Sequence, residues 1–290
     1  MTFSLFIEQL LNGVQLGVML FLMAAGLTLV FGIMNLINLA HGSLYMAGAF
    51  FAATVFQISG SFLLAVPIAV ALTALVGGVV ERAVLRQFYA RSHLDQVLVT
   101  FGLILVFNDA VRLIWGVVPV PLAPPEALAG SVHLFGGVDY PAFRLAILGV
   151  GALVALGLYF VVSHTRIGMW IRAGASNRPM ASALGVDVEL VFSLVFSAGA
   201  GLAGLAGLMA GPITAVQVGM GEPILILALV VTVIGGIGSI RGAFVAALMI
   251  GVGDTFGRVL LPPALGSMAI FMLMAAILAW RPKGLFPVHG

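Results

Sequence analysis

The 290-residue chain is 62% hydrophobic and only 8% charged, and its mean hydropathy is +1.23. Charged residues make up about 25% of an ordinary soluble domain, so the composition excludes that class and indicates an integral membrane protein. There is no cysteine, which excludes disulfides, thiol catalysis and cysteine-ligated metals. No polar stretch is long enough to form a separate soluble domain, so residues 1–290 are expected to be a single membrane domain.

Apolar runs of about the length that crosses a bilayer follow one another along the chain. We predict membrane segments at 8–32, 36–57, 61–80, 94–118, 141–163, 188–211, 222–238, 242–260 and 264–280. Backbone polar groups must be satisfied inside lipid, and the alternation of a membrane barrel is missing. The expected fold is therefore an all-α polytopic bundle of about 8–9 segments. No Lys or Arg precedes the first apolar run, so we expect that run to stay in the membrane rather than act as a cleaved signal peptide.

The basic residues predict the orientation of the bundle, because Lys and Arg concentrate in cytoplasmic loops. One side holds nine of them: Arg82, Arg86, Arg91, Arg166, Arg172, Arg178, Arg241, Arg281 and Lys283. The other side holds three: Arg112, Arg144 and Arg258. This places the N-terminus outside and the C-terminus in the cytoplasm. The proline-rich stretch 118–130 is then an external loop, since its prolines prevent a continuing helix.

Two junctions between apolar runs have no real polar break. They are Gly32 to Asn38 and Gly235 to Gly242, and both are rich in glycine or asparagine. We expect broken or re-entrant helices at both places. Such backbone is tolerated at membrane depth only where protein covers it or water reaches it.

Polar side chains lie inside the apolar sequence INLAHGSLYMAGAF. Asn38, His41 and Ser43 belong to it, and Asn35 comes just before it. Polar groups at membrane depth are functional candidates, so these four residues are the predicted contacts of a substrate pathway. The alternative is that they brace helices against one another by hydrogen bonds.

Two acid-before-base pairs have helical spacing. They are Asp109 with Arg112, and Asp254 with Arg258. Each pair is expected to neutralise itself near the outer end of its segment. A sharper hypothesis is that they form an outer gate.

The longest polar passage, about 164–187, is the predicted cytoplasmic coupling loop. Pro179 suits a first helical turn, Ser176 or Asn177 suits the N-cap, and Gly185 suits the stop. We predict a helix of about six residues between these signals, roughly 9 Å long, that presents a small apolar face to a partner protein. Its residues are Asn177, Arg178, Met180, Ala183, Leu184 and Gly185. The alternative is an ordinary connector whose arginines touch lipid headgroups.

The sequence holds no site for an energy source or a catalyst. Its single lysine, Lys283, is not in a phosphate-binding loop, so any ATP-driven work must come from another chain. No catalytic residue, metal site or bound cofactor is predicted. GGIGSIRGAF, from Gly235 to Phe244, lacks the βαβ context of a dinucleotide fingerprint and is expected to be a hinge or a close contact.

Three stretches carry a resemblance. GLTLVFGIMN with INLAHGSLYMAGAF, the block from Arg166 through Asn177 to ALGVD, and VTVIGGIGSIRGAFVAALMIG resemble the LivH-type permeases of branched-chain amino acid ABC importers. The resemblance implies a second, LivM-type permease, two ATPase subunits that bind ATP and Mg, and a periplasmic substrate-binding protein. It also implies that residues from about Ala173 to Gly185 form the coupling loop. Asn177, Arg178 and Pro179 depart from the coupling motif common in other importers.

The predicted function is that of a permease subunit in the bacterial inner membrane, moving branched-chain or related hydrophobic amino acids by alternating access. No contact with nucleic acid is expected. Amides, urea or small carboxylates are alternative substrates, and an ion-coupled secondary transporter is a rival class. An intramembrane hydrolase would need His41 paired with Ser43 or Ser239, and the first two point to different faces of a helix.

Overall fold

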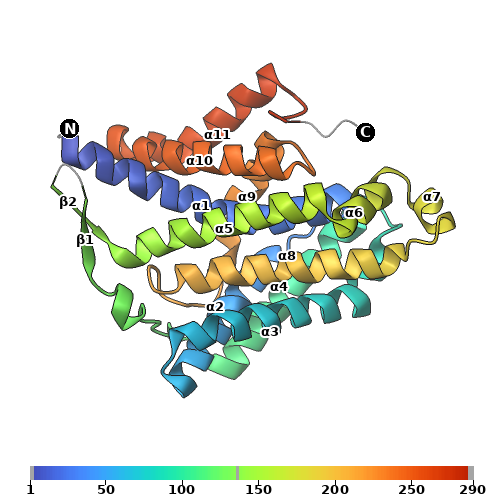
Figure 1. Cartoon of the computed structure of the whole chain (residues 1–290), viewed down its shortest axis with the longest axis horizontal. Helices are drawn as coiled ribbons and strands as arrows, with labels where there is room; N and C mark the ends of the chain where they lie inside the picture. Colours follow the sequence, from blue (N-terminus) through green and yellow to red (C-terminus); the bar gives the residue numbers. More distant parts are fainter. Residues whose placement is uncertain (1–2, 135–136, 287–290) are drawn as a thin grey trace.

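The computed structural model describes residues 3–134 and 137–286, and these residues form a bundle of roughly parallel and antiparallel helices (Figure 1). The α-helices are α1 (Phe3–Met34), α2 (His41–Ser59), α3 (Phe62–Ala83), α4 (His93–Trp115), α5 (Ala142–His164), α6 (Arg166–Ser176), α7 (Arg178–Ala183), α8 (Val188–Ala210), α9 (Gly221–Gly235), α10 (Ile240–Leu260) and α11 (Pro263–Trp280). Short 3-10 turns lie at Leu85–Phe88 and Glu126–Leu128.

Seven of the described helices are long and apolar enough to cross a membrane, and α9 and the Met268–Trp280 part of α11 are shorter apolar helices. The all-α class is therefore confirmed, and each predicted segment coincides with a helix. Helix α1 begins at Phe3 rather than at 8, and α4 ends at Trp115 rather than at 118. Two further boundaries, next to the predicted breaks, were also wrong. The second segment begins at His41 rather than at 36, and α9 ends at Gly235 rather than at 238. Both errors lie at the predicted breaks, where Asn35 and Gly236 adopt positive φ angles of 53° and 98° that end a right-handed helix.

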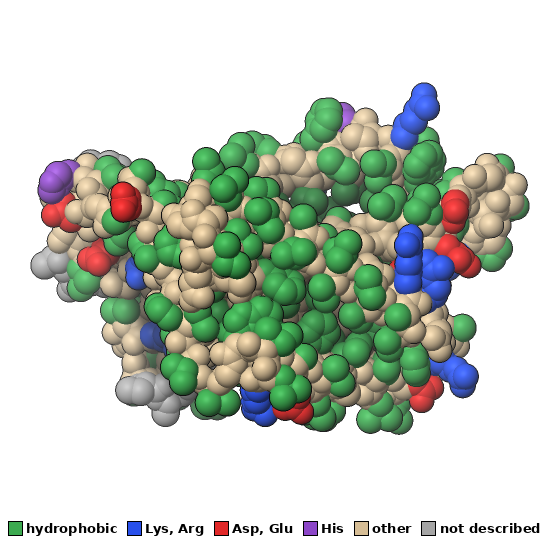
Figure 2. All heavy atoms as spheres, turned by 90° about the horizontal axis from the view of Figure 1, so that it is seen from below, with side chains coloured by type: hydrophobic (Ala, Val, Ile, Leu, Met, Phe, Trp, Pro, Cys, Tyr) green, Lys and Arg blue, Asp and Glu red, His purple; other side chains and the backbone are tan. Residues whose placement is uncertain are grey.

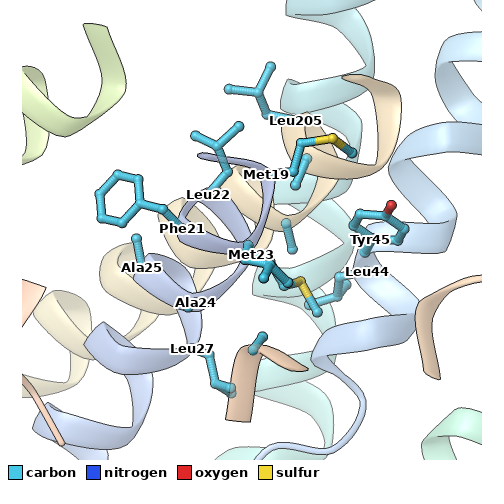
Figure 3. Close-up of a cluster of buried hydrophobic side chains, with 14 of the residues drawn as sticks. Met19, Phe21, Leu22, Met23, Ala24, Ala25, Leu27, Leu44, Tyr45 and Leu205 are labelled. Atoms are coloured by element: carbon cyan, nitrogen blue, oxygen red, sulfur yellow. The ribbon is translucent and has the colours of Figure 1, made fainter. Parts of the chain in front are cut away.

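Helix α1 forms the centre of the bundle. Its 32 residues span about 48 Å, and the stretch from Val18 to Val30 is buried on every face. Figure 3 shows part of this cluster, in which α1 side chains meet Leu44 and Tyr45 of α2 and Leu205 of α8. A helix that is apolar on every face is stable where other helices surround it. Besides α2, helices α8, α9 and α10 pack against α1 and bury its remaining faces.

Small residues let the inner helices approach closely. Gly48 of α2 lies against the backbone of Gly204 of α8, and a Cβ added at Gly48 would lie 2.5 Å from the Gly204 carbonyl oxygen. Gly42 of α2 meets Gly221 of α9 in the same way. Van der Waals contact between backbones is the main source of helix association inside a membrane, where lipid is as apolar as the side chains. The glycines therefore fix α2 between α8 and α9.

The outer helices expose apolar side chains. In the most apolar stretches of α3, α4 and α5, only 22%, 17% and 11% of the residues are buried inside the bundle. Figure 2 shows one face on which hydrophobic side chains cover the middle, while most charged side chains lie toward the two ends. This is the distribution expected of a surface that faces lipid or another membrane subunit.

Three elements were absent from the predictions. Strands β1 (Ser131–Leu134) and β2 (Val138–Pro141) form an antiparallel hairpin, and α6 is an amphipathic helix of 11 residues. The hairpin follows the proline-rich stretch, which contains no α-helix, as predicted. Tyr140 anchors the hairpin by donating to Asn12 Oδ1 at 3.1 Å, and burial raises the pKa of its hydroxyl. The hairpin and α7 mark opposite ends of the bundle, called here the hairpin end and the α7 end (Figure 1).

Candidate functional site

The break after α1 leaves six residues, 35–40, outside any helix. The ring of His41, the first residue of α2, lies against Gly26 of α1, at 2.9 Å from a Cβ added there. Gly26 is eight residues before the end of α1, or about 12 Å along its axis. Residues 35–40 therefore run back into the bundle as a re-entrant segment. Gln96 of α4 covers it, since its Oε1 accepts from the Ile37 N–H at 3.4 Å.

The four predicted pathway residues differ in exposure. Asn35 is exposed at the turn, whereas Asn38, His41 and Ser43 are only 1%, 0% and 4% exposed. Among the described residues, neither side-chain amide atom of Asn38 and neither ring nitrogen of His41 has a hydrogen-bond partner. The Met23 carbonyl lies near the ring but outside hydrogen-bond geometry. Buried polar groups in proteins are nearly always paired, so Asn38 and His41 are available to a polar group or a water that reaches them.

The two predicted breaks lie side by side. Gly32 of α1 packs on the backbone of Gly238, in the turn between α9 and α10. The hydroxyl oxygens of Thr28 and Thr232 are 3.2 Å apart, and they join α1 to α9 one turn deeper. Ser239 caps α10, its Oγ accepting from the Gly242 N–H at 3.1 Å. Neither ring nitrogen of His41 is hydrogen-bonded to Ser43 or Ser239 in the part of the chain that the structure describes.

The polar passage folds as two short helices. Asn177 caps α7, its Oδ1 accepting from the Met180 N–H at 3.0 Å, and Gly185 ends the turn with a φ of 86°. The helix covers six residues, as predicted. Met180 and Leu184 are 57% and 78% exposed, so the predicted apolar face lies on the surface at the α7 end.

Arg178, the first residue of α7, faces the opposite way. Its Nη2 donates to the carbonyl oxygens of Ile33 at 3.2 Å and Met34 at 2.7 Å, the last two residues of α1. Its guanidinium also lies over the ring of Phe192 in α8, 4.7 Å from the centroid. Of the predicted coupling residues, this one therefore contacts its own subunit.

A second polar cluster at the α7 end was missed by the sequence reasoning. Glu81 of α3 is fully buried, and its carboxylate accepts from Tyr89 at 2.5 Å, from Ser193 of α8 at 2.6 Å and from Arg86 Nε at 3.4 Å. Arg86 also pairs with the exposed Glu189 at 3.0 Å. Burial raises the pKa of the Tyr89 hydroxyl, and the hydrogen bond to Glu81 raises it further. The cluster ties α3 to α8, and a glutamate directly after an apolar segment was the available signal.

Both predicted ion pairs are present toward the C-terminal ends of their helices. Arg112 Nη1 lies 3.0 Å from Asp109 Oδ1, and Arg258 Nε lies 2.8 Å from Asp254 Oδ2. The first pair is largely exposed, whereas the Asp254 side chain is 5% exposed. Their role as a gate stays a prediction. A further polar contact joins α4 to α9, where Asn108 Nδ2 donates to Glu222 Oε1 at 2.7 Å.

Comparison with known proteins identifies the family to which this helical bundle belongs. Residues 9–278 match the family model described as the permease component of the branched-chain amino acid transport system. The chain belongs to this family. One similar protein is the high-affinity branched-chain amino acid permease BraD of Pseudomonas aeruginosa, which is 31% identical over 97% of this chain and 95% of its own length. The high-affinity branched-chain amino acid permease LivH of Escherichia coli is 29% identical over 98% of this chain and 96% of its own length.

A sugar permease is also similar. The ribose import permease RbsC of Escherichia coli is 28% identical over 84% of this chain and 76% of its own length. The resemblance drawn from the sequence is confirmed, and this family member is a multi-pass membrane protein. The breaks, the re-entrant segment and α7 all lie within the matched residues.

Proposed function

We propose that this chain is a permease subunit of an ABC importer for branched-chain amino acids in the bacterial inner membrane. Membership of the family supports the transport class. The amino acid permease BraD matches 97% of the chain, against 84% for the ribose permease, which favours an amino acid over a sugar. Asn38 and His41 are buried polar groups within an apolar bundle, and such groups could bind the polar head of an amino acid.

The observation that carries the proposal is the exposed apolar face of α7. Met180, Ala183 and Leu184 form it at the end of the bundle where most basic residues gather. Helices with apolar anchors at this spacing bind in grooves of partner proteins. Two ATPase subunits that bind ATP and Mg are the proposed partners, with α7 in the groove of one of them. A second permease and a periplasmic binding protein complete the proposed assembly.

The orientation follows from the same end. Nine of the 12 basic residues lie in the segments expected on that side, so the α7 end is proposed to face the cytoplasm. The N-terminus, at the hairpin end in Figure 1, then lies outside. Substrate would pass from the hairpin end toward the re-entrant segment. Movement of α7 with the ATPases would change which end of the pathway is open.

Uptake by the assembled importer in proteoliposomes tests the proposal. Labelled leucine, isoleucine and valine should enter with ATP and binding protein, whereas ribose, urea and acetamide should not. Ala183→Arg and Gly185→Pro should abolish uptake while ATP hydrolysis continues. Ser182→Gln, on the other face of α7, adds no charge beside Arg178; it is the control and should transport normally. Uptake by this chain alone, driven by an ion gradient without ATP, would refute the proposal.

A further inference from the structure

The contact made by Arg178 joins the polar loop to the place where α1 breaks. Arg178 is two residues before Met180, about 200° around the helix from the exposed apolar face. Its guanidinium is half-buried and bridges the carbonyl oxygens of Ile33 and Met34. One short helix therefore presents an apolar face outward and a cation inward.

The end of α1 is suited to such a cation. The last carbonyl groups of a helix have no partner within it and carry the negative end of the helix dipole. A guanidinium can donate to two acceptors at fixed geometry, and hydrogen bonds from an ionised donor are stronger than neutral ones. Asn35, with a φ of 53°, follows immediately and starts the re-entrant segment. Arg178 thus holds the last residues before the break.

The segment beyond the break is buried but makes few short hydrogen bonds. The Ile37 N–H reaches Gln96 Oε1 only at 3.4 Å, and the His41 N–H reaches the Asn38 carbonyl at 3.4 Å. The buried side chains of Asn38 and His41 have no hydrogen-bond partner among the described residues. A small shift of the end of α1 would therefore reposition polar groups that can gain partners.

The same guanidinium is linked to the Glu81 cluster through two aromatic rings. It lies over Phe192, whose ring meets that of Tyr89 at a centroid distance of 6.1 Å, and Tyr89 donates to Glu81. Phe192 and the Glu81 cluster belong to the α3–α8 contact. This contact provides a fixed support against which α7 and Arg178 are positioned.

We propose that Arg178 is the positioning residue that transmits movement of α7 to the re-entrant segment 35–40, and so to Asn38 and His41. The inference rests on the proposed function, because it requires that a partner moves α7. It assigns Arg178 to transmission inside the subunit rather than to contact with the ATPase. A lysine would keep the charge and could still donate to the carbonyls, but its ammonium group could not stack flat on the Phe192 ring.

Spin-label distances in the assembled importer test the inference. The chain has no cysteine, so spin labels can be attached at introduced cysteines when the partner subunits are also cysteine-free. One double variant, Ser182→Cys with Ile58→Cys, measures the distance from α7 to α2. The other, Ile37→Cys with Ile58→Cys, measures the distance from the re-entrant segment to α2. In the otherwise unchanged protein, ATP should change both distances. In Arg178→Gln the α7 distance should still change, and the Ile37 distance should not. Arg166→Gln is the control, since Arg166 is exposed and forms no ion pair with the described residues.

Uptake should fall about tenfold in Arg178→Gln, the scale of a coupling change along such a contact chain, with ATP hydrolysis retained. Arg178→Lys should be intermediate, and it serves as the test if the glutamine variant does not assemble. An ATP-dependent change at Ile37 that survives in Arg178→Gln, or uptake equal to the Arg166→Gln control, would overturn the inference. Absence of any ATP-dependent change at Ser182 in the unchanged protein would instead refute the proposed docking of α7.

Discussion

Removal of the buried carboxylate at Glu81 tests how the α3–α8 contact is stabilised. In Glu81→Ala the hydroxyl groups of Tyr89 and Ser193 lose a charged acceptor at 2.5 and 2.6 Å, and Arg86 loses its buried partner. Removing one member of a buried pair costs about 3–5 kcal/mol. Arg86 keeps Glu189 and Ser193 and is 33% exposed, so we take the lower end, about 3 kcal/mol.

The matched control is Glu189→Ala. Glu189 binds the same arginine, but its side chain is 79% exposed, and exposed pairs contribute about 0–1 kcal/mol. At about 2 °C per kcal/mol for a chain of this size, the midpoint of thermal unfolding should fall by about 6 °C for Glu81→Ala and by no more than about 2 °C for the control.

The assay is the midpoint of thermal unfolding in detergent, measured for all variants at one fixed heating rate so that the shifts can be compared. Glu81→Gln should be intermediate, since its amide oxygen still accepts from Tyr89 while the charge is lost. Equal shifts for the alanine variants at Glu81 and Glu189 would show that burial of the carboxylate does not stabilise the contact, and would refute the reasoning.

Three further outcomes are expected. Gly48→Val should prevent α2 from packing on the α8 backbone, so that folded protein recovered from membranes is largely lost, whereas Gly102→Ala, with open space around it, should be recovered normally. Asp254→Asn should lower the unfolding midpoint more than Asp109→Asn, because only the first removes a buried partner; a larger loss for Asp109→Asn would contradict this. Asn177→Ala should weaken α7 by about 1 kcal/mol through loss of its cap and lower the uptake per ATP hydrolysed in proteoliposomes; unchanged coupling would count against α7 as the contact.

The sequence alone determined the elements that depend on local patterns. The membrane helices, the breaks near Asn35 and Gly236 and the six-residue helix after Asn177 were predicted because apolar length, caps and glycine act over a few residues. The pairs at Asp109 and Asp254 were predictable for the same reason, since their partners lie within one helical turn. The amphipathic helix α6 and the hairpin were missed, because their local signals are short and mixed with the polar loops around them.

Only the tertiary structure decided which distant groups meet. Arg178 and the end of α1 are separated by 144 residues, and Ser193 and Glu81 by 112, so no spacing rule relates them. The placement of His41 against Gly26 depends on how closely three helices approach, which backbone packing sets and composition does not. A periodic pattern specifies a helix and its apolar face, whereas the partner of each buried polar group is fixed by the packing of the whole bundle.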